Sequence, residues 1–441
     1  MKTKTTLLLL ISFLTLAWAW NALYLTPLSG DGLWVIRQYG LYLSGQLSIA
    51  MMSVSMILAT RPGWLEPLFK GMDKMYNVHK WTGIAGAGFA ITHWLLKEAG
   101  DPISSLIGKT GRPKLDALPF AQSLHSFGKD IGEWGFYILL LMVALSLWKA
   151  FPYRSWRRIH KIMPAIYLLL VAHTIILMPA SYWASLNGAV MVALLLAGTI
   201  STFITVAKRI GRRHQYVGRV TMVRPHEDQT LEVSCDPGAN WPGHSPGQFA
   251  LLTFDPREGP HPFTIAGAPR ESKQTLTFQI KNLGDYTGKL GRKLTVDQPV
   301  IIEGPYGRFN FRQGRPRASQ VWLAAGIGIT PFLAWLDALQ NKTLDRHTAL
   351  HYVVTKRTGD RFVSLLEMKS RSIGNLELHI HDTQKQGRFL ASHFLNHLYP
   401  NKKNIDLWYC GPASLARSIH KEAKQQNIAN LKIHQEIFNF R

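Results

Sequence analysis

Apolar residues in the first half of the chain form runs long enough to cross a membrane. A bilayer core of about 30 Å needs about 20 consecutive, mostly apolar residues in an α-helix. Such runs occupy residues 6–26, 38–59, 79–98, 132–150, 159–179 and 183–207. The first follows Lys2 and Lys4 and is longer than the apolar core of a signal peptide, so we expect an uncleaved span. The pattern predicts a bundle of six membrane helices.

The pattern changes after Arg213, where short strands are separated by glycine and proline. Their spacing predicts a small antiparallel barrel. From about residue 318 strands and helices alternate, which predicts a parallel sheet. The expected fold class is a membrane all-α six-helix bundle, followed by an antiparallel β-barrel domain and an α/β parallel-sheet domain. The expected domain ranges are 1–207, 208–314 and 315–441.

The formal net charge of +23 lies largely beside the apolar runs. Basic residues cluster at the N-terminus and in the segments 60–78, 151–161 and 208–213, as cytoplasmic loops of membrane proteins do. We therefore expect a multi-pass protein of the cell (inner) membrane, with both termini and the second half in the cytoplasm. This placement accounts for the charge without a nucleic-acid partner. The two cysteines, Cys235 and Cys410, exclude a four-thiolate metal site.

Four histidines fall inside two of the expected spans. Ionisable side chains at membrane depth are functional candidates. His79 and His93 lie on the third span, and His160 and His173 lie on the fifth, which runs in the same direction. His79 and His160 then lie toward the cytoplasm, and His93 and His173 lie toward the outer side. Each level offers two imidazoles, the ligand set of a low-spin haem in a helical bundle.

Helix geometry tests this ligand set. His79 and His93 are 14 residues apart, so both lie on nearly one face of a straight helix. His160 and His173 are 13 residues apart, which leaves them about 140° apart around an ideal helix. Pro164 removes the hydrogen bond to the carbonyl of His160. We therefore predict a kink or a widened turn between His160 and His173.

A glycine-rich turn in the second half predicts a dinucleotide site. Gly326, Gly328, Thr330 and Pro331 follow a strand and begin a helix, so a pyrophosphate can approach the backbone closely. After the next strand we find no acidic residue placed to hold a ribose diol. Lys356 and Arg357 stand there instead, which favours NADPH while leaving NADH possible.

The motifs of the second half, in their order, resemble those of one family. They are Pro246-Gly247-Gln248-Phe249, His261-Pro262-Phe263-Thr264, Lys281 to Thr287, Glu303 to Gly307, the glycine-rich turn and Cys410-Gly411-Pro412. Together with the paired histidines they are similar to the ferric reductase and NADPH oxidase family, and we interpret the chain as a bacterial member. The resemblance implies a domain that binds FAD, a domain that binds NADPH, and two haem b groups held by His79, His93, His160 and His173.

The resemblance also implies roles for single residues. Thr264 would face the flavin ring, and His261, Pro262 and Phe263 would shape its pocket. Lys281, Gly284 and Thr287 would hold the FAD pyrophosphate. The glycine-rich turn would hold the nicotinamide dinucleotide, with Cys410, Gly411 and Pro412 beside the nicotinamide. A C-terminal ring would stack on the flavin, with Phe438 the first candidate and Phe440 the second.

The sequence leaves the final electron acceptor open, and with it the exact function. Arg37 and Lys97 lie at the outer ends of two spans and could form a cationic site above the outer haem. The resemblance implies electron transfer from NADPH through FAD and two haems to O2, which yields superoxide. Reduction of a ferric chelate is the alternative, and a haem conduit to a partner protein is the third. The expected partners are NADPH, the acceptor and membrane lipid, and no obligatory protein partner is evident.

Overall fold

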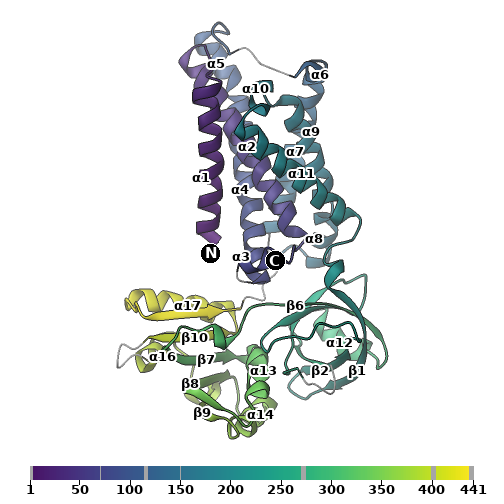
Figure 1. Cartoon of the computed structure of the whole chain (residues 1–441), viewed down its shortest axis with the longest axis vertical. Helices are drawn as coiled ribbons and strands as arrows, with labels where there is room; N and C mark the ends of the chain where they lie inside the picture. The colour runs from purple at the N-terminus through teal and green to yellow at the C-terminus, as the bar shows by residue number, and fades with distance from the viewer. Residues whose placement is uncertain are drawn as a thin grey trace. The chain divides into compact units, whose positions relative to one another are not determined.

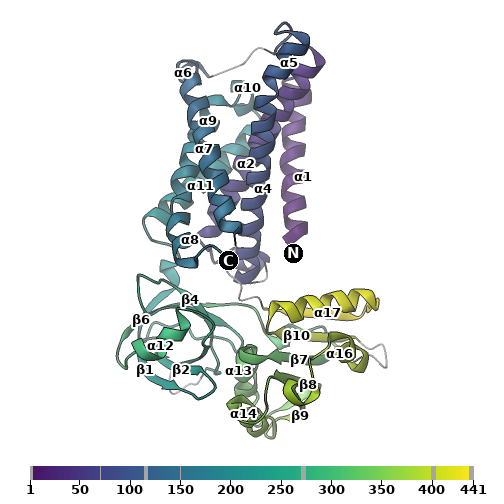
Figure 2. The ribbon, with the colours of Figure 1, turned by 180° about the vertical axis from the view of Figure 1, so that it is seen from behind.

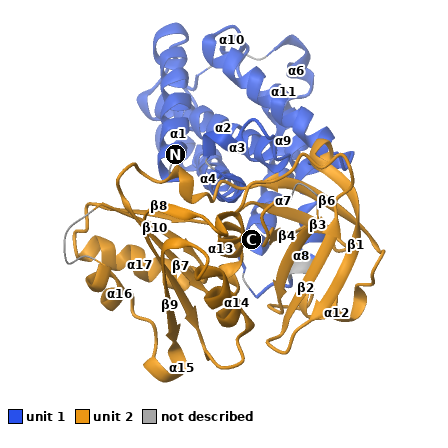
Figure 3. Ribbon diagram, turned by 60° about the horizontal axis from the view of Figure 1, so that its bottom comes forward, with its two compact units in different colours: residues 1–211 blue, residues 212–441 orange. Residues whose placement is uncertain are grey.

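The computed structural model describes residues 3–69, 71–113, 118–148, 150–269, 275–398 and 404–436, except for the side chains of Tyr153 and Arg154. It divides into two compact units, residues 1–211 and 212–441 (Figure 3). The domain boundaries expected at 207/208 and 314/315 remain predictions. The described secondary structure nevertheless changes from helices to strands close to the first of them.

The first unit is a bundle of long helices that run side by side (Figures 1 and 2). The long helices are α1 (Thr3–Trp20), α2 (Gly32–Ala59), α4 (Met72–Glu98), α7 (His125–Leu147), α9 (Met163–Leu177) and α11 (Leu186–Val206). A π-helical turn, η1 (Asn21–Leu25), continues α1. The shorter helices are α3 (Glu66–Phe69), α5 (Gly100–Ile107), α6 (Pro119–Ser123), α8 (Tyr153–His160) and α10 (Ala180–Trp183).

The membrane helices bear out the fold class. Within the described residues, five segments are long and apolar enough to span a membrane: 3–25, 32–59, 125–147, 155–177 and 186–206. Helix α4 has 27 residues and is long enough too, but it is less apolar because it carries His79, His93 and several charged residues. It packs against α2 and α7 in the bundle, so it is the sixth helix of the expected set. The chain is a multi-pass membrane protein.

The predicted irregularity in the fifth span is confirmed. Helix α8 ends at His160, and α9 begins at Met163 with Pro164 in its first turn. Lys161 and Ile162 form a turn between the two helices. Proline suits the first turn of a helix because the amide hydrogen that it lacks has no partner there. Because of this break, His160 and His173 do not keep the relative orientation that one straight helix would give them.

The second unit begins with a six-stranded antiparallel sheet in the order β4-β3-β6-β1-β2-β5. The strands are β1 (Gln215–Pro225), β2 (Thr230–Asp236), β3 (Phe249–Thr253), β4 (His261–Thr264), β5 (Leu276–Lys281) and β6 (Pro299–Tyr306). Ile265, just after β4, pairs with Phe278 of β5, so the two outer strands meet and the sheet closes nearly into a barrel. Short helical pieces accompany it: η2 (Arg212–His214), α12 (Thr287–Lys293) and η3 (Phe311–Gln313).

A five-stranded parallel sheet follows, in the order β11-β10-β7-β8-β9. Its strands are β7 (Ser319–Ala325), β8 (Thr343–Val354), β9 (Gly374–Asp382), β10 (Ile405–Cys410) and β11 (Leu431–Gln435). Helices α13 (Thr330–Leu339) and α14 (Arg361–Ser370) cover one face, and α16 (Ala391–Leu398) and α17 (Ala413–Gln425) cover the other. The turns η4 (Gly326–Ile329) and α15 (Thr383–Gln386) complete the unit. Strand β7 is buried on both faces, as the apolar run of residues 321–325 requires.

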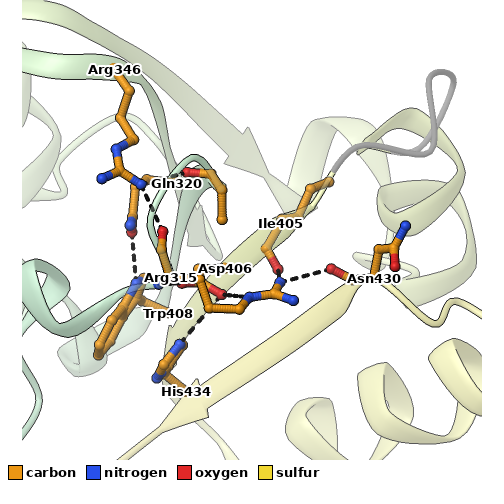
Figure 4. A network of polar contacts seen from close by, with 9 residues as sticks. Arg315, Gln320, Arg346, Ile405, Asp406, Trp408, Asn430 and His434 are labelled. Carbon is orange, nitrogen blue, oxygen red and sulfur yellow. Dashed lines mark hydrogen bonds and ion pairs between the residues drawn. The ribbon is translucent and has the colours of Figure 1, made fainter.

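A polar network fixes the connection between the two sheets (Figure 4). Asp406 is fully buried on β10 and accepts hydrogen bonds from the backbone N–H and the Nε–H of Arg315, the latter at 2.9 Å. The Arg315 guanidinium also donates to the carbonyl oxygens of Ile405 and Asn430, both at 2.8 Å. Arg346 donates to the Arg315 carbonyl at 2.9 Å. The segment that connects the two sheets is therefore hydrogen-bonded to β8, to β10 and to the residue just before β11.

Candidate functional site

The four membrane histidines form two pairs, as the sequence predicts. The ring centroids of His79 and His160 are 6.4 Å apart, and those of His93 and His173 are 6.2 Å apart. An imidazole nitrogen binds a first-row metal at about 2.0 Å, and the ring centroid lies about 1.1 Å farther out. Two imidazoles on opposite sides of one iron therefore have centroids about 6.2 Å apart. Both pairs have the separation that a haem iron needs.

Hydrogen bonds orient three of these rings. The Nδ1 atoms of His79, His93 and His173 lie 2.9, 2.9 and 2.8 Å from the carbonyl oxygens of Ser55, Leu41 and Gly128. A carbonyl can only accept, so each Nδ1 carries the hydrogen, and each Nε2 keeps a lone pair for a metal. Such bonds to the second nitrogen are typical of metal-ligating histidines. The arrangement fits haem ligation by Nε2.

His160 is held differently. Its ring stacks on Trp156 of the same helix, with centroids 5.0 Å apart. Its Nδ1 is buried and has no hydrogen-bond partner among the described residues. The turn at Lys161 and Ile162 follows it directly, so its orientation depends on stacking and on the helix break.

Two glycines make room for the outer pair. A Cβ atom at Gly132 would lie 2.1 Å from Nδ1 of His173, and one at Gly45 would lie 2.9 Å from Nδ1 of His93. Any side chain at Gly132 would displace the His173 ring, because atoms without a bond cannot approach so closely. The sequence does not reveal these glycines as part of the site, because only the folded helix pairs bring them against the histidines.

The outer cationic site differs from the expectation for Lys97. Arg37 is 6% exposed and donates from Nη2 to the carbonyl of Lys97 at 2.8 Å, so the two residues do come together. The Lys97 ammonium, however, pairs with Glu133 at 2.7 Å and Glu98 at 3.2 Å. These carboxylates oppose the binding of an anion at Lys97. The Nε of Arg37 is buried without a partner in the described part of the chain, so Arg37 is the better candidate to meet an anionic group.

The residues expected to bind FAD gather on one side of the barrel. Strand β4 carries His261, Pro262, Phe263 and Thr264, with Thr264 buried. The His261 ring stacks on Tyr286, with centroids 3.7 Å apart and planes at 12°. Tyr286 lies inside the Lys281 to Thr287 motif, and its pairing with His261 is visible only in the fold.

The Lys281 to Thr287 segment forms a compact loop between β5 and α12. The Thr287 hydroxyl accepts a hydrogen bond from the backbone N–H of Leu283 at 3.0 Å and donates to the Gly284 carbonyl at 3.4 Å. Lys281 is exposed at the end of β5. The loop thus offers backbone groups and one cation to an anionic ligand, which suits a pyrophosphate.

The glycine-rich turn and the Cys410-Gly411-Pro412 segment meet where the strand order reverses. A Cβ at Gly328 would lie 2.2 Å from the Cys410 carbonyl oxygen, so the two segments are in close contact. Gly326 has a φ of +56°, a conformation that favours glycine. Ligands of open parallel sheets bind at this position, beyond the carboxyl ends of the strands. The geometry fits a dinucleotide held by the Gly326 and Gly328 backbone.

Three residues that were expected at the dinucleotide site are buried, so their side chains would contribute to binding less directly than expected: Thr330, Pro331 and Cys410. Thr330 and Pro331 are buried in α13, and the Thr330 hydroxyl donates to the Ile327 carbonyl at 3.1 Å. They shape the turn from inside. Cys410 is 2% exposed, and burial, together with the negative charge of Glu436, holds its pKa well above the usual range. Its thiol therefore stays protonated.

The loop after β8 corrects one expectation. Lys356 and Arg357 are exposed at the carboxyl end of β8, as predicted. Glu367 of α14 reaches the same loop, where its Oε1 lies 2.6 Å from Nη2 of Arg357. The expectation that no acidic residue is placed at this position is therefore wrong. Glu367 lies ten residues beyond Arg357, and only the turn of the chain into α14 brings it back.

The C-terminal aromatic residues, Phe438 and Phe440, lie outside the described residues. The last described residue, Glu436, is buried, and its Oε1 lies 3.0 Å from the position of a Cβ at Gly307 of the barrel. Glu436 thus lies beside the end of β6 in the barrel.

A membrane bundle with two histidine pairs, joined to a barrel and a parallel dinucleotide-type sheet, defines the class of membrane flavocytochromes. Two family models match the chain: "Ferric reductase like transmembrane component" at residues 44–171 and "FAD-binding domain" at residues 216–310. The chain belongs to the ferric reductase and NADPH oxidase family, whose members are oxidoreductases.

Curated relatives of several kinds are similar to parts of the chain. An anthranilate 1,2-dioxygenase electron transfer component of Acinetobacter baylyi is 27% identical over 44% of this chain and 57% of its own length. Respiratory burst oxidase homolog protein E of Arabidopsis thaliana is 26% identical over 43% of this chain and 22% of its own length. Ferric reduction oxidase 4 of Arabidopsis thaliana is 31% identical over 27% of this chain and 19% of its own length. The chain therefore spans 57% or less of these relatives.

Proposed function

We propose that the chain takes electrons from NADPH on the cytoplasmic side of the membrane and delivers them to O2 on the other side, forming superoxide. When bound, FAD would accept the hydride and release single electrons, and two haems would carry these electrons across the bilayer. The observation that carries the proposal is the presence of two histidine pairs at haem-ligand separation in one chain with a barrel and a dinucleotide-type sheet.

The residues of the chain have distinct tasks in this proposal. His79 and His160 would hold the inner haem, and His93 and His173 the outer haem. The orienting bonds to Ser55, Leu41 and Gly128 hold three of the rings in place before the haem binds, which lowers the cost of ordering them. Arg37, buried near the outer pair, supplies a positive charge that would stabilise an anionic group there.

The second unit would position the two nucleotides. His261 to Thr264, with Tyr286, form the wall for the flavin ring, and the Lys281 to Thr287 loop would hold its pyrophosphate. Gly326, Gly328, Gly411 and Pro412 would line the crevice for NADPH, with Lys356 and Arg357 at the far end of the dinucleotide. A C-terminal ring, Phe438 or Phe440, would cover the flavin until nicotinamide displaces it. The basic segments beside the spans support placing this unit in the cytoplasm.

Reduction of a ferric chelate is the second candidate. It is favoured by the match of residues 44–171 to the ferric reductase model and by the similarity to a ferric reduction oxidase. The ion pairs of Lys97 with Glu98 and Glu133 reduce the attraction for an anionic chelate, which is why we place O2 first.

One assay separates the two acceptors. The purified protein in detergent is supplied with NADPH and FAD, and dye reduction is followed with and without superoxide dismutase. We expect dye reduction that the dismutase suppresses. Dismutase-insensitive reduction of ferric citrate would instead establish the ferric reductase activity and reject superoxide formation as the main reaction.

A further inference from the structure

The loop after β8 and the start of α14 line a shallow, open pocket of about 430 Å³. It is lined by residues 357–361 and by Val363, Ser364 and Glu367. Strand β8 pairs with β7, which leads into the glycine-rich turn. In a doubly wound sheet, the end of this second strand lies at the adenosine ribose of a bound dinucleotide. The pocket therefore lies where the 2′ position of the ribose of a bound dinucleotide would be recognised.

Two of the charged side chains that line the pocket are committed elsewhere. Arg361 donates to Glu232 at 3.2 Å and to Gln279 at 2.5 Å, both on the barrel. Asp360 accepts from the backbone N–H groups of the first turn of α14 and from the Tyr352 hydroxyl at 3.2 Å. These bonds hold the pocket together and leave Arg361 and Asp360 little freedom to meet a ligand.

The remaining charged pair is Arg357 and Glu367. Their side chains are 56% and 35% exposed, and both line the open pocket. The backbone N–H of Arg357 donates to the Asp382 carboxylate at 3.0 Å, which fixes the loop at this residue. The 2.6 Å ion pair then fixes the guanidinium relative to the Glu367 carboxylate.

These two groups favour different cofactors. A guanidinium binds a 2′-phosphate through charge-assisted hydrogen bonds, which selects NADPH. A carboxylate accepts a hydrogen bond from a 2′-hydroxyl, which selects NADH, and it repels a phosphate. Because the two groups are in direct contact, a ligand that reaches one also meets the other. Neither cofactor is then strongly excluded.

We infer that Glu367, paired with Arg357, sets the choice between the two nicotinamide cofactors and allows NADH to compete with NADPH. The inference rests on the proposed function, because it assigns the nucleotide preference of that same site. The hydride transfer itself is unchanged, and only the relative binding of the two donors depends on this pair.

The test uses the full-length protein in detergent. Glu367→Gln keeps the size of the side chain and removes its charge, and Arg357→Gln removes the guanidinium. Binding of adenosine 2′,5′-bisphosphate and of 5′-AMP is measured by calorimetry, and anaerobic flavin reduction is measured with NADPH and with NADH. The control is Glu422→Gln, which alters a carboxylate on α17 that bonds Gln426.

We expect Glu367→Gln to raise the preference for the bisphosphate over AMP, and for NADPH over NADH, about tenfold. Arg357→Gln should lower both preferences by a similar factor, and Glu422→Gln should change neither. Unchanged nucleotide preferences in Glu367→Gln overturn the inference. If the analogues respond as expected but neither NADPH nor NADH reduces the flavin, the proposed function fails and the assignment of the pocket stands.

Discussion

Histidines cluster in two regions of the molecule, and the two clusters are built differently. In the membrane bundle, three of four rings donate from Nδ1 to a backbone carbonyl and face a second imidazole across about 6 Å. In the parallel sheet, the buried His351 of β8 contacts two histidines of β9. Its Nδ1 lies 3.1 Å from Nε2 of His381, and its ring stacks on His379 at 4.5 Å.

The difference separates ligands from packing residues. Rings that donate from Nδ1 to the backbone keep the Nε2 lone pair, and in each membrane pair the partner ring stands at the separation of a shared metal. His351 instead bonds one neighbouring imidazole and stacks on another. No group of three or more His, Cys, Asp or Glu suited to a metal ion occurs in the described ranges, the sheet histidines included. The number of histidines in a region therefore does not tell whether they bind a metal. The group that each Nδ1 contacts is the more informative feature.

The largest effect is expected when one ligand of a pair is removed. His173→Ala should remove the outer haem and abolish electron delivery to the outer acceptor. Flavin reduction by NADPH should persist, because the second unit is unaltered. Haem content by absorbance and NADPH-dependent dye reduction at the flavin measure the two properties. As the counterpart in the sheet, His351→Leu should retain both haems, and haem loss in that variant would contradict the distinction between the clusters.

A smaller effect is expected from crowding the outer pair. A Cβ at Gly132 would overlap the His173 ring, so Gly132→Ala should weaken outer-haem retention about tenfold. Gly88→Ala is the matched control, because a Cβ there has no atom within 4 Å. Haem loss is followed by absorbance during dilution in detergent. Equal retention in the two variants would show that Gly132 does not define the space for His173.

The sheet cluster should make the protein sensitive to acid. Burial, and then the nearby charges of His379, His381 and His397, lower the pKa of His351 to about 3. Below about pH 6.5, the ordinary pKa of histidine, His351 is protonated in the unfolded chain but stays neutral in the folded chain. The free energy of unfolding therefore falls as the pH falls from about 6.5 toward 3. Between pH 7.5 and pH 5 this loss is about 2 kcal/mol.

The measurement is thermal unfolding of the full-length protein across this pH range, followed by release of flavin fluorescence. His351→Leu should flatten the decline, since it removes the titrating group. If the variant declines as steeply as the unaltered protein, His351 is not the source of the acid sensitivity.

The smallest effect is expected at the inner pair. The Ser55 hydroxyl lies 3.0 Å from Nδ1 of His79, in addition to the Ser55 carbonyl at 2.9 Å. Ser55→Ala removes the weaker of two contacts, so haem affinity should fall about fivefold or less. Titration of the haem-free protein with haem measures the change. Complete loss of the inner haem would mean that the hydroxyl, and not the carbonyl, orients His79.

Much of this architecture can be predicted from the sequence because it depends on residues that are close together in the chain. Apolar runs give the helices, and the 13-residue spacing of His160 and His173, with Pro164, predicts the helix break that the structure contains. The barrel and the parallel sheet follow from strand spacing and the glycine-rich turn. These features need only residues that are near one another in the chain.

The remaining features depend on contacts between distant residues. The carbonyls that orient His93 and His173 lie 52 and 45 residues away in sequence. Glu133 neutralises Lys97 from a different helix, and Glu367 approaches Arg357 only after α14 turns back. A backbone carbonyl leaves no signal in residue identity, and a carboxylate on a helix is usually solvated. Such partners are therefore hidden until the fold is known.

The number and ligation of haems in the purified full-length protein test the proposed electron path most directly. Haem per chain is determined by absorbance, and electron paramagnetic resonance reports the ligands of the oxidised iron. We predict two low-spin haems per chain with two imidazoles each, both reduced by NADPH in the absence of oxygen. A single haem, a high-spin iron, or no haem reduction by NADPH would contradict this prediction.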